Sequence, residues 1–255
     1  MDFGMRIRFS LTFKGKMILP IHYNHLLQGF IYTNLHDKDL QIRYHDQGFI
    51  EKGRHMKLFT FSRLFGSYEI DQSKKSIAFT PPVSLTVSSV GSDFLSGFAE
   101  EILTSNLLYL NGTRLEVKAF EPLTFKGNKQ NVQIEMMSVL TVYQTLSLNG
   151  RNNTKYFSPW DKEFPELIKS NMLRKISIID KALNPDDLDF SIKPMMEENE
   201  KFQKIINFKG TVIKGWLGSY LLSGSEDLIR LAYYAGLGSK NSEGFGCFRI
   251  LGTGE

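Results

Sequence analysis

The stretch MRIRFSLTFK, residues 5–14, alternates between apolar and polar side chains without a break. One side of an extended chain would carry Met5, Ile7, Phe9, Leu11 and Phe13, and the other would carry Arg6, Arg8, Ser10, Thr12 and Lys14. This period of two predicts a half-buried strand whose outer face is basic. After Pro20, the pattern over residues 23–34 has the spacing of an amphipathic helix. The chain therefore opens with a strand and then a helix.

The next predicted elements extend this order. Residues 57–61 read as a strand, and residues 76–90 as a pair of strands that turns near Pro81 and Pro82. A helix over residues 92–103, with Ser92 or Asp93 as its cap, and a strand over residues 113–120 follow. The order β-α-β-β-α-β is that of the ferredoxin-like fold, in which an antiparallel sheet carries both helices on one face.

A second round of the same order follows a polar segment, FKGNKQN, at residues 125–131. We expect a strand over 132–142 with a bulge between Met136 and Met137, and a helix from Ser158 onward. Strands over 188–192 and within 205–222 come next, then a helix over 225–235 that ends at Gly236, and a last strand over 245–251. The sequence thus predicts an α+β protein of two tandem ferredoxin-like domains, residues 1–124 and 132–255, joined by a linker at 125–131.

The composition restricts the size of the core, the kinds of partner and the cellular compartment that are expected. A chain of 255 residues with 42% apolar content can bury two cores. A net charge of +4 permits a polyanionic partner without demanding one. The single cysteine, Cys247, excludes an internal disulfide and a cysteine-based zinc site, which indicates a cytoplasmic protein. No stretch predicts a membrane span, so no membrane partner is expected.

The most unusual motif is GLGSKNSEGFGCF, residues 236–248. It is not a dinucleotide fingerprint, because Asn241 stands where the third glycine would be and the loop runs from helix to strand. It is not a Walker A loop either, because Gly238 and Gly244 are separated by five residues. A capped helix end and a tight entry into a strand would explain some of these glycines. The remainder favour a loop that offers backbone N–H groups and Lys240 to a phosphate backbone.

Two tandem ferredoxin-like domains that end in such a loop resemble the repeat-associated RNA-binding (RAMP) superfamily of CRISPR systems. More narrowly, the segments PIHYNHLLQGFIYTNL (20–35), YHDQGF (44–49), KLFTFSRLFG (57–66) and SPWDKEF (158–164) are similar to the endoribonucleases that cut CRISPR repeat RNA. The resemblance covers essentially the whole chain. It implies an enzyme without a cofactor that cleaves precursor CRISPR RNA within its repeats. The implied partners are repeat RNA and a CRISPR effector complex, and the chain would be a monomer or a homodimer.

All five histidines fall within the first 55 residues, but no two stand four apart on a helix face, so we expect no metal site. RNA can be cut without a metal because its own 2′-OH is a neighbouring nucleophile. A histidine can take up or give a proton near neutral pH, a lysine can offset charge on the phosphorane, and a tyrosine hydroxyl can orient the substrate. The products would be a 2′,3′-cyclic phosphate and a 5′-OH.

In the family pattern these roles fall on Tyr32, His45 and Lys57. His36 or His55 could replace His45, and Lys52 could replace Lys57. The residues expected to contact RNA are Arg6, Arg8, Lys52, Arg54, Gly236, Gly238, Lys240, Gly244 and Gly246. Two other functions remain open from the sequence: a RAMP-type subunit that binds RNA without cutting it, and an unrelated enzyme on the same scaffold.

Overall fold

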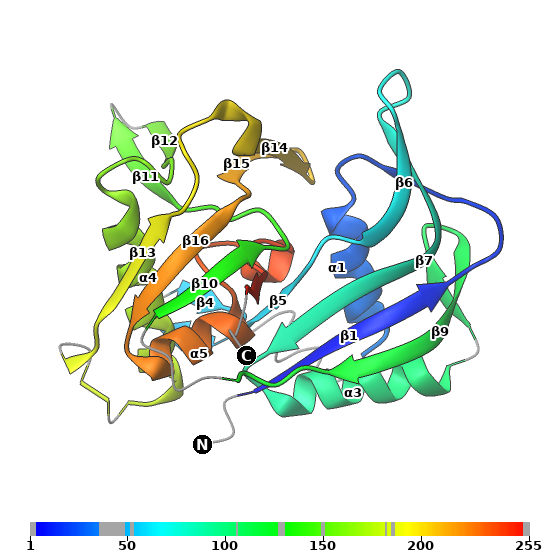
Figure 1. Cartoon of the computed structure of the whole chain (residues 1–255), viewed down its shortest axis with the longest axis horizontal. Helices are drawn as coiled ribbons and strands as arrows, with labels where there is room; N and C mark the ends of the chain where they lie inside the picture. Colours follow the sequence, from blue (N-terminus) through cyan, green and yellow to red (C-terminus); the bar gives the residue numbers. More distant parts are fainter. Residues whose placement is uncertain are drawn as a thin grey trace.

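The computed structural model describes residues 4–35, 49–51, 54–105, 107–126, 131–148, 151–181, 183–184 and 187–251. Within them, two antiparallel sheets lie side by side, one built from the N-terminal half of the chain and one from the C-terminal half (Figure 1). The buried residues form a separate large apolar cluster for each half.

The first sheet has seven strands, and its central order is β2-β7-β1-β9-β8, with β5 and β6 also paired to β7. Helices α1 (Asn24–Thr33) and α3 (Ser92–Thr104) pack against it. The strands are β1 (Met5–Thr12), β2 (Met17–Pro20), β5 (Phe59–Phe61), β6 (Phe65–Asp71), β7 (Ser76–Ser89), β8 (Leu108–Leu110) and β9 (Thr113–Pro122).

Both helices lie on the same face of this sheet, as one contiguous group of aromatic rings shows. Phe9, which points inward from β1, makes an edge-on contact with Phe98 of α3 at a centroid distance of 5.6 Å. Phe98 in turn meets Phe30 of α1 at 6.1 Å. The alternation of β1 and the 3.6-residue period of the helices direct these rings into one core.

The second sheet has the order β13-β16-β10-β17. It is formed by β10 (Asn131–Met136), β13 (Phe190–Pro194), β16 (Ser219–Gly224) and β17 (Phe248–Ile250), with α4 (Phe164–Ile179) and α5 (Glu226–Ala235) as its helices. In each half the first strand lies between the last and the third, and the second strand pairs with the third. This is the strand order of the ferredoxin-like fold, so the predicted fold class of two tandem ferredoxin-like units is confirmed.

Three further hairpins and two short helices are attached to this framework. They are β3 (Phe49–Glu51) with β4 (Arg54–Met56), β11 (Tyr143–Leu148) with β12 (Arg151–Tyr156), β14 (Gln203–Phe208) with β15 (Thr211–Trp216), η3 (Glu200–Phe202) and η4 (Asn241–Glu243). None of the three hairpins was separately predicted.

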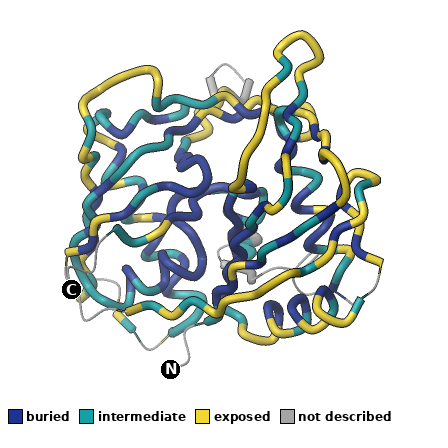
Figure 2. The backbone as a smooth tube through the Cα atoms, turned by 45° about the vertical axis from the view of Figure 1, so that its right-hand side comes forward, coloured by how far each residue is buried: buried dark blue, intermediate teal, exposed yellow. Residues whose placement is uncertain are grey.

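One local prediction is wrong and another is supported. Residues 76–89 form one continuous strand, β7, and the expected turn at Pro81–Pro82 is absent. The turn lies instead between β6 and β7, where the amide of Lys75 donates to the carbonyl of Gln72. That hairpin is an exposed projection (Figure 2), and without a buried face its first strand lacks a clear alternation of apolar residues. The predicted bulge lies directly after β10, which ends at Met136: the amides of Met137 and Ser138 both donate to the carbonyl of Cys247, so two residues oppose one as in a β-bulge.

Candidate functional site

The glycine-rich loop, residues 236–248, lies at the junction of the two halves. α5 ends at Ala235, and Gly236 follows with a φ of 83°, which fits its predicted role of ending the helix. A Cβ atom on Gly236 would come within 2.7 Å of Asn241 Nδ2, and one on Gly244 within 2.5 Å of the Phe61 ring. Side chains at Gly238 and Gly246 would overlap the carbonyl oxygens of Thr141 and Leu237. Close packing of backbone and side chains therefore requires glycine at all four positions.

The structure corrects the expectation that the four glycines themselves contact RNA. All four are buried. Several amides on both arms of the loop donate within the protein, among them Leu237 N to Gly246 O at 2.9 Å, Ser239 N to Thr141 O at 2.8 Å, and Gly246 N to Val139 O at 2.9 Å. The glycines shape the loop, and its side chains are what it presents outward.

Lys175 and Asn241 fix the shape of the loop from inside. Lys175, on α4, is only 2% exposed, and its Nζ donates to Gly236 O at 2.7 Å, Gly238 O at 3.0 Å and Asn241 Oδ1 at 2.8 Å. Asn241 Nδ2 donates to Leu237 O at 2.8 Å and Phe245 O at 3.0 Å, so one amide spans both arms of the loop. Burial lowers the pKa of Lys175 to about 7, because a charged ammonium is disfavoured away from water.

Sequence reasoning missed both residues, although one signal was available. Lys175 stands seven residues after Ile168 and next to Ile176, on the apolar stripe of α4. A lysine on a buried stripe is rare unless its ammonium has partners.

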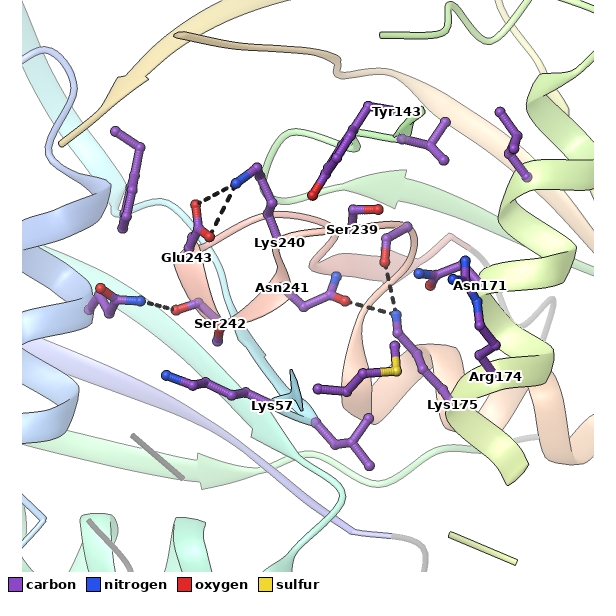
Figure 3. Close-up of a pocket in the computed structure, with 17 residues that line it drawn as sticks. Lys57, Tyr143, Asn171, Arg174, Lys175, Ser239, Lys240, Asn241, Ser242 and Glu243 are labelled. Carbon is purple, nitrogen blue, oxygen red and sulfur yellow. Dashed lines mark hydrogen bonds and ion pairs between the residues drawn. The ribbon is translucent and has the colours of Figure 1, made fainter. Parts of the chain in front are cut away.

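A pocket of about 410 Å³ lies in front of this loop, between the two halves of the chain. The N-terminal half contributes Gln28 and Lys57 to its wall, and the C-terminal half contributes Tyr143, Asn171 and residues 238–243, among others. Figure 3 shows the loop on one side of the pocket and α4 on the other. Apart from the buried Lys175, the described wall carries three cationic side chains against one carboxylate: Lys57, Arg174 and Lys240 against Glu243. Such a pocket attracts an anion.

Two of the predicted catalytic residues lie together, and one of them lines this pocket. Lys57 lines it, and its Nζ is 5.5 Å from the ring centroid of Tyr32. Tyr32, on α1, is partly buried with its ring edge-on to Phe59 at 5.7 Å. α1 is docked on the glycine-rich loop, since Gln28 Nε2 donates to Ser242 O at 2.8 Å and Asn24 Nδ2 to Gly244 O at 3.1 Å. The loop thereby holds in place the helix that carries Tyr32.

The predicted histidine cannot be placed beside them. His45, its alternative His36 and the predicted RNA contact Lys52 lie outside the described residues. Arg54 and the other alternative, His55, belong to β4, but their side chains are also outside the described part of the chain. The last residue of β4, Met56, lines the pocket, and so does Lys57, which directly follows it.

Lys240 is the side chain that the loop presents to the pocket. Its φ of 62° is left-handed, and its Nζ lies 3.3 Å from Glu243 Oε1 and 5.7 Å from the ring centroid of Tyr143. The ion pair is partly exposed, with the Lys240 side chain 19% accessible. Lys240 can therefore exchange its carboxylate partner for a phosphate at modest cost.

The two arginines of β1 have different environments, and the expectation for Arg6 is wrong. Arg6 is 2% exposed because the C-terminal half covers this end of the strand. Its guanidinium donates to Tyr233 O at 3.0 Å and to Phe248 O, and it lies 4.2 Å from the centroid of the Tyr233 ring. Arg6 joins the two halves and is not a surface for RNA. Arg8 is exposed as expected and pairs with Glu121 at 3.0 Å.

The described residues show neither a metal centre nor a membrane-spanning helix. Among them, no three His, Cys, Asp or Glu side chains are grouped so that they could hold a metal ion. The helices of that same part of the chain include none with the length and apolar character needed to cross a bilayer.

Comparison of the fold with solved structures identifies the class of protein. The structure superposes on that of a Cas6-related protein from Pyrococcus furiosus with a TM-score of 0.83 at 21% identity, covering 98% of this chain and 99% of the other. It also superposes on a structure described as a RAMP protein binding different RNA substrates, with a TM-score of 0.81 at 22% identity over 97% of this chain and all of the other. The protein therefore shares the fold of these proteins.

Comparison of the sequence with known families and proteins then identifies the family. The family described as "CRISPR associated protein Cas6, C-terminal" matches residues 121–250, just over half of the chain. The CRISPR-associated endoribonuclease Cas6 1 of Methanocaldococcus jannaschii is 23% identical over 95% of this chain and 91% of its own length. The endoribonuclease-like protein Cas6nc of Pyrococcus horikoshii is 26% identical over 97% of this chain and 100% of its own. The chain belongs to the Cas6 family of CRISPR-associated proteins, which confirms the resemblance seen in the sequence.

Proposed function

We propose that the protein is a metal-independent endoribonuclease that cuts precursor CRISPR RNA within its repeats. The observation that carries the proposal is the cationic pocket between the two halves, which is lined by Lys57 and Lys240 and where Lys57 lies near the ring of Tyr32. Residues 36–55, which contain the candidate histidines, join α1 to this same wall. Tyrosine, lysine and histidine from neighbouring elements can together catalyse RNA cleavage through the 2′-OH.

The reaction uses the 2′-OH of the substrate as its nucleophile. His45 accepts the proton of that hydroxyl while its oxygen attacks the adjacent phosphorus. A new O2′–P bond forms, the P–O5′ bond breaks, and the departing 5′-oxygen takes a proton from a water molecule. Lys57 stabilises the charge that builds up on the phosphorane, and the Tyr32 hydroxyl orients the substrate. The products are a 2′,3′-cyclic phosphate and a 5′-OH end.

Binding of the strand is a separate task from cutting it. Lys240 contacts a phosphate at the pocket, and Lys52, Arg54 and Arg8 offer further cationic contacts along the strand. The buried glycines and Lys175 act indirectly, because they fix where Lys240 and Tyr143 stand.

The test is to incubate the protein with repeat-containing RNA in excess EDTA, using a normal substrate and one with a single 2′-deoxy nucleotide immediately 5′ of the cut. We expect cleavage of the normal RNA, with a cyclic phosphate detected by mass spectrometry, and no cleavage of the deoxy RNA. Cleavage that requires added Mg²⁺, or that survives the deoxy substitution, would overturn the mechanism.

The second candidate function is that of a RAMP subunit that binds RNA without cutting it. The observation that favours it is that the described residues lining the pocket include no histidine that could transfer a proton. High affinity for repeat RNA with no detectable product under any buffer condition would select this function over the first.

A further inference from the structure

One buried polar atom in the pocket wall has no hydrogen-bond donor among the described residues of the protein. Asn171, on α4, is 6% exposed, and its Oδ1 has no hydrogen-bond partner among the described residues. The side chain lines the pocket between the two halves and extends from α4 toward the glycine-rich loop (Figure 3). A buried acceptor without a donor costs stability, so such an atom commonly marks a place where something else binds.

The chemistry of this atom restricts what can occupy the position. Oδ1 accepts a hydrogen bond, so its partner must bring an N–H or O–H group. An ionised phosphodiester has no hydrogen to donate and belongs beside the cations of the pocket. The partner of Asn171 is therefore a different part of the ligand from the part that meets Lys240.

The surroundings of Asn171 suit a flat, largely apolar group. Leu58, Val142 and Leu167 contribute apolar surface to the same pocket, and Tyr143 contributes an aromatic ring. The volume of about 410 Å³ can accept a group larger than water. A nucleobase turned out of a single strand combines an apolar body with N–H donors at its edge.

We propose that Asn171 reads an adenine base of the bound RNA in this pocket, with Oδ1 accepting from the exocyclic amino group. An asparagine amide places an acceptor beside a donor, which matches the amino group and ring nitrogen of adenine. The inference rests on the proposed RNA-binding function and adds to it a base-selective contact, separate from the residues assigned to cleavage.

The test uses fluorescein-labelled RNA octamers whose affinity is measured by anisotropy. One octamer is all adenosine, and the second is all purine riboside, which lacks the 6-amino group but keeps the charge and the ring. We expect the wild-type protein to bind the adenosine octamer about tenfold more tightly. Asn171→Leu should abolish this difference while binding of the purine riboside octamer changes less than about twofold. Ser170→Ala, at the exposed neighbouring position on α4, is the matched control and should retain the difference.

Two readouts separate recognition from a structural role. Because Asn171→Leu removes an unpaired buried acceptor, its melting temperature without RNA should equal or exceed that of the wild type. A 2′-deoxyadenosine octamer tests the other donor in the strand: if Asn171→Leu has no effect on its binding, the partner of Asn171 is the 2′-OH and the proposal is overturned. Equal binding of the adenosine and purine riboside octamers by the wild type would also overturn it. Failure of the wild type to bind either octamer or repeat RNA would instead overturn the RNA-binding function itself.

Discussion

The Nζ atom of Lys57 lies 5.5 Å from the ring centroid of Tyr32. The two residues come from different elements, since Tyr32 belongs to α1 and Lys57 precedes β5. Docking of α1 on the glycine-rich loop brings this pair to the edge of the cationic pocket. The residues assigned to chemistry and those assigned to binding are thus parts of one junction between the two halves.

Replacing Lys57 should affect cleavage more than binding. Loss of a group that stabilises transition-state charge typically lowers a rate about 100- to 1000-fold, and we expect Lys57→Ala to fall in that range. Lys57→Arg should retain part of the rate because it keeps the charge. Single-turnover cleavage and the affinity for the 2′-deoxy RNA are the measurements. Lys118→Ala, an exposed position on β9, is the control, and a Lys57→Ala variant as fast as this control would remove Lys57 from the mechanism.

Lys240 offers a test of binding that leaves the fold intact. Its left-handed φ of 62° suits glycine, so Lys240→Gly relieves backbone strain while making the unfolded chain more flexible, and stability should change by less than about 1 kcal/mol. RNA affinity should fall, and the slope of log affinity against log salt should become shallower by about 0.7 for one lost phosphate contact. Lys75→Gly is a matched control, because Lys75 is an exposed lysine with a φ of 49° on the β6–β7 hairpin. Equal effects of the two variants on RNA binding would contradict a specific contact by Lys240.

Glycine is required at 246 for packing as well as for conformation. Gly246 has a φ of 78°, and a Cβ there would overlap Leu237 O. Gly210 has a similar φ of 85° with open space around it. We therefore expect Gly210→Ala to cost about 1 kcal/mol in the free energy of unfolding, and Gly246→Ala to cost at least twice that amount. Urea unfolding measures both, and equal costs would show that close packing at the loop is unimportant.

Lys175 gives a prediction about pH. Burial lowers its pKa in the folded protein to about 7, while a lysine in an unfolded chain has a pKa of about 10.4. Between these values the unfolded chain binds the extra proton, so the contribution of Lys175 to the free energy of unfolding rises with pH and is lost as the pH falls through 7. The stability of the wild type relative to Lys175→Met should therefore increase from pH 7 to pH 9. A difference that stays constant over this range would contradict the assignment.

The regular elements could be predicted because their periodicity reflects local burial. The alternation in β1 and the stripe in α5 each identify a face that meets the core of the same half. Arg6 was misjudged for the complementary reason: its exposure is decided by Tyr233 and Phe248, more than 200 residues away, and not by the pattern of its own strand. Contacts between the halves leave no local period in the sequence.

The same limit applies to the candidate site. The resemblance to the family marked Tyr32 and Lys57, and the glycine spacing marked the loop. The direction in which that loop faces depends on three hydrogen bonds from Lys175 and on packing against Phe61, which the sequence does not reveal. Asn171 was missed because an asparagine within a helix is ordinarily a solvent-facing residue.

The central claim is that the RNA strand occupies the pocket between the two halves. Photo-crosslinking tests it most directly, with repeat RNA that carries a 2′-deoxy nucleotide at the cut and a single 4-thiouridine beside it, followed by mass spectrometry of the attached peptides. We predict that the crosslinks fall on peptides containing Lys57, Tyr143 or Lys240. Crosslinks confined to surfaces away from the pocket, such as the β6–β7 hairpin, would contradict the account.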